Sequence, residues 1–171
     1  ISLPGGCAIG TRPVDLHLFA LKKLGAKIKI KNGYIFAEAK HGLKGTKITF
    51  PQISVGATEN ALLASFNAKG KTVLNNCAIE PEVIDLIKFL NKLGGNIKVI
   101  GRKILIQENL KIKKILNHKV IFDRIELGTY MIAAALIGKR VIFDRINSRI
   151  IKKEIEILKR MGVKIKLKKD Q

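Results

Sequence analysis

The sequence contains an internal repeat, and this feature limits the possible folds more than any other. Three ten-residue segments share one pattern, and they lie at positions 21–30, 90–99 and 158–167. Each begins with Leu, has a basic residue before a central glycine, and ends with alternating polar and apolar residues. Their glycines, Gly25, Gly94 and Gly162, recur at almost equal intervals along the chain. Each segment is typical of a helix end, a glycine in the left-handed conformation and an alternating strand. The sequence therefore predicts one helix–turn–strand unit used three times.

A second shared element keeps the same phase. Positions 64–76 and 132–146 both indicate a helix, a glycine and a strand, and Gly70 and Gly138 are separated by the same interval as Gly94 and Gly162. The full unit therefore has about two helices and several strands, which predicts an α/β fold, and the chain holds about two and a half copies. Such a unit leaves an apolar face uncovered unless copies pack together, so we expect an array or closed ring of units. The partial copy suggests that the chain is a fragment.

The helix expected before Gly94 has the spacing of an amphipathic helix. Its apolar positions follow the i, i+3, i+4, i+7 rule, and the residues are Val83, Leu86, Ile87, Leu90 and Leu93. Pro81 and Glu82 suit its first turn. We expect each such helix to cover a sheet.

Composition excludes several classes of protein. With 47% hydrophobic and 27% charged residues among 171, the chain can form one or two globular domains with a sizeable core. Its longest apolar window, at 131–138, is well below the roughly 20 residues that cross a bilayer. The first residues do not resemble a secretory signal. Two cysteines without metal-ligand spacing predict a reducing cytoplasm, and no motif indicates a metal or cofactor.

The net charge of +20 raises the possibility of a polyanionic partner such as nucleic acid. Most of the basic residues are lysines spread through the helix and strand patterns, and aromatic residues make up only 5% of the chain. A nucleic-acid surface needs basic residues gathered with stacking aromatics. The pattern therefore favours lysine-rich solvated faces, with a basic nucleic-acid-binding module as the alternative.

The segment at positions 3–17 carries the strongest chemical signal. It places Cys7 in a loop with three glycines, directly before Arg12 and a helix expected to begin at Pro13. Glycines let backbone N–H groups approach a ligand, a helix start binds anions, and arginine is a forked phosphate donor. A cysteine in so electropositive a loop should have a pKa below its usual ~8.5, which suits proton transfer or nucleophilic attack. The alternative is a small buried residue, and this is what we expect of Cys77.

The same segment, Leu-Pro-Gly-Gly-Cys-Ala-Ile-Gly-Thr-Arg-Pro-Val-Asp-Leu-His, resembles the active loop of the UDP-N-acetylglucosamine enolpyruvyl transferases. Further stretches resemble that family in the same order, at positions 33–37, 43–45, 54–60, 80–85, 89–94 and 123–129. The resemblance implies two domains, each an inside-out α/β barrel, or prism, of three βαβαββ-type units. Residues 1–121 would then be part of the catalytic domain and 122–171 the opening of the second domain, with Asp123 capping a helix.

The resemblance also implies a reaction. The family transfers enolpyruvyl from phosphoenolpyruvate to the 3′-hydroxyl of UDP-N-acetylglucosamine with release of phosphate, the first committed step of peptidoglycan synthesis. Cys7 would donate a proton to phosphoenolpyruvate, could form a covalent adduct with it, and is the position that fosfomycin alkylates. The implied partners are these two small molecules and the remainder of the same polypeptide, in a bacterial cytoplasm, without a cofactor.

Two segments would bind the substrates, and their residues are Arg12, Pro13, Val14, Asp15 and Leu16 in the first and Ile53, Ser54, Val55 and Gly56 in the second. Ser54 would also cap the helix that begins there. Gln52 departs from the lysine of some relatives, which weakens its case as a phosphate contact. Because other functional parts of the family lie outside these residues, the segment alone should be inactive.

Three rival interpretations remain open besides the nucleic-acid module. A sister enolpyruvyl transferase acts on shikimate 3-phosphate, but it lacks the Pro-Gly-Gly-Cys loop. The chain could be a structural fragment without an enzymatic role. A Cys–His nucleophile formed with His17 has little support, because His17 lies ten residues from Cys7 on a helix without an Asn or Asp partner.

Overall fold

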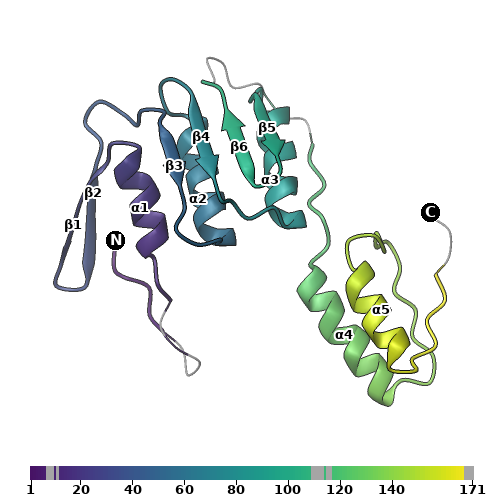
Figure 1. Cartoon of the computed structure of the whole chain (residues 1–171). Helices are drawn as coiled ribbons and strands as arrows, with labels where there is room; N and C mark the ends of the chain where they lie inside the picture. The colour runs from purple at the N-terminus through teal and green to yellow at the C-terminus, as the bar shows by residue number, and fades with distance from the viewer. Residues whose placement is uncertain (7–9, 11, 109–113, 115–116, 168–171) are drawn as a thin grey trace. The chain divides into compact units, whose positions relative to one another are not determined.

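The computed structural model describes residues 1–6, 10, 12–108, 114 and 117–167 of the chain (Figure 1). The chain divides into two compact units, Ile1–His118 and Lys119–Gln171. Each unit is described by itself. The assignment of residues 1–121 and 122–171 to two domains of a longer enzyme stays a prediction.

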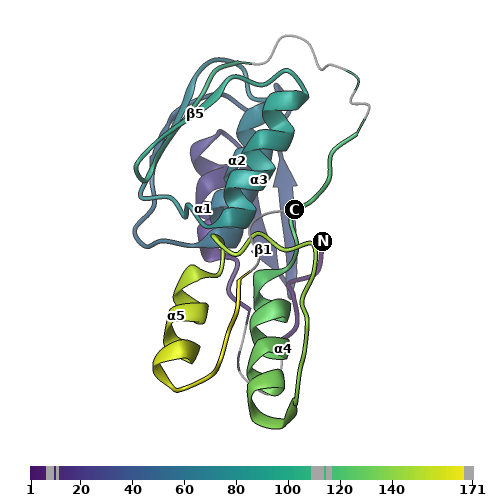
Figure 2. The same cartoon turned by 90° about the vertical axis from the view of Figure 1, so that its right-hand side faces the viewer.

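The first unit is a mixed α/β structure. Its helices are α1 (Asp15–Lys23), α2 (Val55–Phe66) and α3 (Pro81–Lys92), and its strands are β1 (Lys27–Lys31), β2 (Tyr34–Glu38), β3 (Lys47–Thr49), β4 (Thr72–Asn75), β5 (Ile97–Ile100) and β6 (Lys103–Ile106). Strands β1 and β2 form an antiparallel hairpin. The other four form a sheet in the order β3-β4-β6-β5, in which only β3 and β4 run parallel. Figures 1 and 2 show the three helices on one face of this sheet.

The core of the first unit lies between these helices and the sheet. Ile48, Leu74 and Ile104 are direct cross-strand partners on β3, β4 and β6, and all three are fully buried. Each such side chain contributes about 1.5–3 kcal/mol through burial. Leu62 of α2 and Val83 of α3 are also fully buried in this cluster. The period-two and helical apolar patterns therefore meet in one core, as the sequence predicts.

The repeated glycines end three helices in the same way. Gly25, Gly94 and Gly162 have φ values of 101°, 104° and 92°, in the left-handed region. In each copy the glycine N–H donates to the carbonyl three residues earlier, and the next N–H donates to the carbonyl five residues before it, at 3.0–3.1 Å. This is the Schellman arrangement of a helix C-terminus. The predicted helix–turn–strand unit is confirmed at Gly25 and Gly94, while at Gly162 only its helix and turn are present in the described residues.

The second unit departs from the predicted pattern. It contains α4 (Arg124–Ile137) and α5 (Lys152–Arg160), but the strands expected after Gly138 and Gly162 are absent from its described residues. Gly138 has a φ of −84° and is not left-handed. A strand needs a neighbour that satisfies its backbone groups, and the described part of this unit offers none.

The helices of the second unit form a small core of their own. Its buried residues are Leu127, Met131, Ile151, Ile155 and Leu158. Asp123 caps α4 as predicted, since its Oδ1 accepts from the N–H groups of Ile125 at 2.8 Å and Glu126 at 3.0 Å. Helix α4 is apolar on most sides, yet Leu136 and Ile137 remain 79% and 87% exposed. None of the helices in the described residues is sufficiently long and apolar to span a membrane.

Candidate functional site

The first predicted binding segment leads into α1. This helix begins at Asp15 with Val14 as its N-cap, so the predicted start at Pro13 is wrong by two residues. The cause is the backbone of Val14, which lies outside the helical region at φ −115° and ψ 11°. Arg12, Pro13 and Asp15 are exposed, while Leu16 is buried in the core. The carboxylate of Asp15 lies in the first turn, where the helix dipole favours a negative charge.

The second predicted segment forms the start of α2. Ser54 is the N-cap, and its hydroxyl accepts from the N–H of Ala57 at 3.3 Å, which confirms the predicted cap. The hydroxyl of Thr58 donates to the Ser54 carbonyl at 2.7 Å and accepts from the N–H of Ala78 at 3.1 Å. Thr58 and Ala78 are fully buried. One buried hydroxyl therefore ties the start of α2 to the segment that precedes α3.

The loop before α2 leaves the core at a fixed point. Phe50 donates its N–H to the carbonyl of Asn75 at 3.1 Å, and its own carbonyl accepts from Nδ2 of Asn76 at 2.9 Å. The ring of Phe50 packs against Phe19 of α1, with ring centroids 6.4 Å apart. Residues 51–54 are thus anchored from β4 and from α1. Ile53, one of the predicted binding residues, is 44% exposed in this loop.

The two predicted binding segments lie next to each other. A Cβ added at Gly56, the second residue of α2, would lie 3.1 Å from Nε2 of His17, the third residue of α1. At their other ends, α1 and α2 both bond to the segment at positions 43–44. The Lys44 N–H donates to the carbonyl of Leu24, and the Lys69 N–H donates to the carbonyl of Leu43. The helices therefore run side by side in the same direction. The first-turn N–H groups of both helices therefore lie at one place, and those without a partner in the helix suit the binding of an anion.

His17 lies where the two predicted binding segments meet, a position that its place in the sequence does not predict. Its Nδ1 is buried and has no hydrogen-bond partner in the described residues, and its Nε2 faces Gly56. Any larger residue at position 56 would displace this ring. The available signal was the place of His17 at the end of the Cys7 motif, but its contact with α2 could not be derived from spacing.

Cys7, the predicted reactive residue, lies outside the described residues, so its role stays a prediction. The backbone before it is anchored, because Leu3 N–H donates to the carbonyl of Gly33 at 2.7 Å. Cys77 is fully buried after β4, and burial raises the pKa of its thiol to about 12. The expectation that Cys77 is a small buried residue is confirmed.

Acidic groups lie on the helices beside the site. Burial raises the pKa of Glu59 on α2, and the neighbouring Glu82 on α3 raises it further. The described residues contain no cluster of His, Cys, Asp and Glu that could hold a metal ion.

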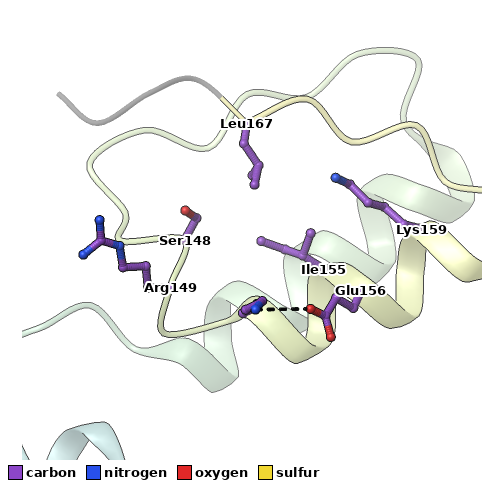
Figure 3. Close-up of a pocket in the computed structure, with 7 residues that line it drawn as sticks. Ser148, Arg149, Ile155, Glu156, Lys159 and Leu167 are labelled. Carbon is purple, nitrogen blue, oxygen red and sulfur yellow. Dashed lines mark ion pairs between the residues drawn. The ribbon is translucent and has the colours of Figure 1, made fainter.

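A hollow in the second unit contains none of the predicted site residues (Figure 3). It follows α5, where Lys152 and Glu156 form an ion pair at 3.7 Å. Its lining residues are Ser148, Arg149, Lys152, Ile155, Glu156, Lys159 and Leu167.

The β1–β2 hairpin gathers basic and aromatic side chains that are scattered in the sequence. Lys29 pairs with Phe36 and Lys31 pairs with Tyr34, and because paired residues share a face, all four lie on one side. All four side chains are exposed. We refer to them as the lysine–aromatic face. The expectation that basic and aromatic residues are not gathered is therefore wrong at this hairpin.

Comparison with known proteins identifies the family. The sequence profile of EPSP synthase (3-phosphoshikimate 1-carboxyvinyltransferase) matches residues 1–171. The UDP-N-acetylglucosamine 1-carboxyvinyltransferase of Pelagibacter ubique (strain HTCC1062) is 54% identical over 171 residues, which are 100% of this chain and 41% of that protein. The protein of the same name from Endomicrobium trichonymphae is 49% identical over 166 residues, or 97% of this chain and 40% of its own.

Solved structures support the fold. The enolpyruvyl transferase NikO from Streptomyces tendae matches with a TM-score of 0.76 and 22% identity, over 93% of this chain and 41% of that chain. EPSP synthase from Acinetobacter baumannii matches with a TM-score of 0.59 and 24% identity, over 73% and 28%. The predicted α/β fold of the enolpyruvyl transferases is confirmed. The chain spans about two fifths of the length of the curated relatives that it matches. It belongs to the EPSP synthase family of enolpyruvyl transferases.

Proposed function

We propose that the protein containing these residues transfers an enolpyruvyl group from phosphoenolpyruvate to the 3′-hydroxyl of UDP-N-acetylglucosamine. The observation that carries this proposal is the 54% identity over all 171 residues with a relative named for that substrate. The family profile alone does not separate this reaction from transfer to shikimate 3-phosphate. The relatives at 46–54% identity do favour the nucleotide sugar.

The paired helix starts suit the binding of a nucleotide diphosphate. Arg12 lies exposed just before α1 and offers a forked donor, while the first turns of α1 and α2 supply backbone N–H groups. Residues Arg12–Leu16 and Ile53–Gly56 would together hold the uridine nucleotide. The buried Thr58 hydroxyl and the Phe50 contacts keep the second of these segments in place before substrate arrives.

The chemistry would proceed by addition and elimination. The 3′-hydroxyl would lose its proton to a base from the remainder of the polypeptide as its oxygen forms a bond to C2 of phosphoenolpyruvate, while C3 gains a proton from Cys7. The C2–O bond to phosphate would then break as C3 returns a proton to the thiolate, so inorganic phosphate leaves and the vinyl group is restored. The same thiol could bond to C2, because a residue that delivers a proton to C3 is within reach of the neighbouring carbon. Other catalytic groups would come from the remainder of the polypeptide, and the setting would be the bacterial cytoplasm.

The test uses the protein extended to the length of its relatives. It should release phosphate from phosphoenolpyruvate only when UDP-N-acetylglucosamine is added, and shikimate 3-phosphate should not replace that substrate. Cys7→Ala should abolish turnover and labelling by fosfomycin, whereas Cys77→Ala serves as the matched cysteine control and should retain both. Phosphate release with shikimate 3-phosphate but none with the nucleotide sugar would reverse the assignment.

A further inference from the structure

The last residue of the first unit is held by a buried polar contact outside the candidate site. Nε2 of His118 lies 3.2 Å from Oδ2 of Asp85, and the two side chains are only 10% and 12% exposed. The imidazole also meets the ring of Phe89 edge-on, with centroids 5.2 Å apart and an interplanar angle of 64°. Asp85 and Phe89 are four residues apart on α3 and so lie on one helical face. We refer to these three side chains as the clasp.

The clasp is not explained by stability alone. Asp85 is the only charged residue among the buried polar residues of the described part of the chain. Burying a carboxylate is costly, and well-packed apolar residues often stabilise a core as well as an ion pair does. Nδ1 of His118 is also buried and lacks a partner among the described residues. A directional polar contact with this cost is better suited to fixing a position than to filling space.

The place of the clasp in the chain indicates what it positions. Asp123, the N-cap of α4 in the second unit, follows His118 by only five residues. Glu108, ten residues before His118, also contacts the first unit, because its Oε2 accepts from the N–H of Gly70 at 2.9 Å. We propose that His118 is a positioning residue, which Asp85 and Phe89 hold so that the connection between the two units starts at a fixed point on α3.

The size of the effect follows from the length of the connection. With the clasp closed, about five residues separate His118 from Asp123; if it opens, the tether lengthens to at most about fifteen residues, the separation of Glu108 from Asp123. The effective concentration of one tethered unit near the other falls roughly as the −3/2 power of tether length. The upper limit, a threefold longer tether, therefore lowers it about fivefold. Only the kinetic readout rests on the proposed function, because in that reaction both units would have to act on the same pair of substrates.

The experiment measures the connection directly in the protein extended to the length of its relatives. Lys119 follows His118 and is exposed, so trypsin cleavage after Lys119 can be followed by mass spectrometry. His118→Ala and Asp85→Ala should each raise that cleavage rate severalfold, because Lys119 then no longer follows an anchored residue, and the double variant should match the single ones because both remove one contact. His41→Ala removes an exposed histidine of the same unit and should leave the rate unchanged. His118→Gln, which keeps a donor for Asp85, should recover part of the protection.

The kinetic arm separates positioning from catalysis. His118→Ala should raise KM for UDP-N-acetylglucosamine by up to about fivefold with kcat within twofold, and His118→Gln should restore part of the loss. Unchanged cleavage in His118→Ala and His118→Gln, additive effects of the two alanine variants, or a large fall in kcat without faster cleavage would each overturn the proposal. If the unaltered protein releases no phosphate, the proposed function fails while the cleavage assay still decides the role of the clasp.

Discussion

Replacing Thr58 by Val should destabilise the first unit markedly, although the two side chains have nearly the same shape. The hydroxyl of Thr58 is the acceptor for the buried N–H of Ala78, at 3.1 Å. Leaving a buried donor unsatisfied costs about 1–3 kcal/mol, and the middle of this range, about 2 kcal/mol, is the expected loss. The other bond of this hydroxyl matters less, because the Ser54 carbonyl also accepts from the Thr58 N–H at 3.0 Å and stays satisfied. The predicted loss therefore comes from one amide.

Two further variants make this prediction specific. Thr58→Ser keeps the acceptor and loses one methyl group, so it should cost only about 0.8 kcal/mol. Thr129 makes the same bond to the carbonyl four residues earlier, but it is exposed on α4. Thr129→Val should therefore change stability by no more than about 0.5 kcal/mol.

The assay is urea unfolding of the protein extended to the length of its relatives, together with hydrogen exchange at the Ala78 amide. Thr58→Val should lower the unfolding midpoint and speed exchange of that amide, whereas Thr58→Ser should leave the exchange slow. The reasoning is refuted if Thr58→Ser is as damaging as Thr58→Val, or if Thr58→Val matches the Thr129 control.

Four further outcomes are expected. Because burial raises the pKa of Cys77 to about 12, its thiol should resist alkylation at pH 8 until the protein is unfolded, and reaction in the native state would contradict the buried position. The raised pKa of Glu59 means that its ionisation weakens folding as pH rises above 4.5, so Glu59→Gln should raise the urea midpoint at pH 7, with a gain that disappears below pH 4.5. The isolated 171-residue segment should self-associate in sedimentation because α4 leaves apolar side chains exposed, and a monodisperse monomer would count against this. The lysine–aromatic face should bind single-stranded polynucleotides only weakly and without sequence preference; tight binding that persists at physiological salt would favour the nucleic-acid alternative.

Features that depend on neighbouring residues could be predicted from the sequence. The left-handed glycines, the Ser54 cap and the Asp123 cap each rest on hydrogen bonds within a few residues. The first residue of a helix was harder to predict, because Val14 has a non-helical backbone and α1 begins at Asp15, not at Pro13. A local sequence pattern predicts the capping arrangement of a helix better than it predicts the residue at which the helix begins.

Features that depend on distant residues could not be predicted in the same way. The contact of His17 with Gly56 needs the packing of two helices, and the contact of His118 with Asp85 spans 33 residues. The lysine–aromatic face arises from strand register, which composition does not contain. The strands expected near 141–146 and 163–167 have suitable residues but no partner in the described part of the second unit. The reactive loop itself was predicted from a resemblance, and Cys7 lies outside the described residues.

The shared helix ending has a consequence for how such a protein could be rearranged. Gly25, Gly94 and Gly162 adopt closely similar positive φ values and make the same pair of hydrogen bonds. In each copy the chain therefore leaves the helix in nearly the same direction relative to the helix axis. A crossover between gene copies at one of these glycines would join the helix of one copy to the segment that follows the glycine of another without disturbing the turn. The same positions therefore suit the exchange of segments within this chain, because the turn geometry at the three glycines is already matched.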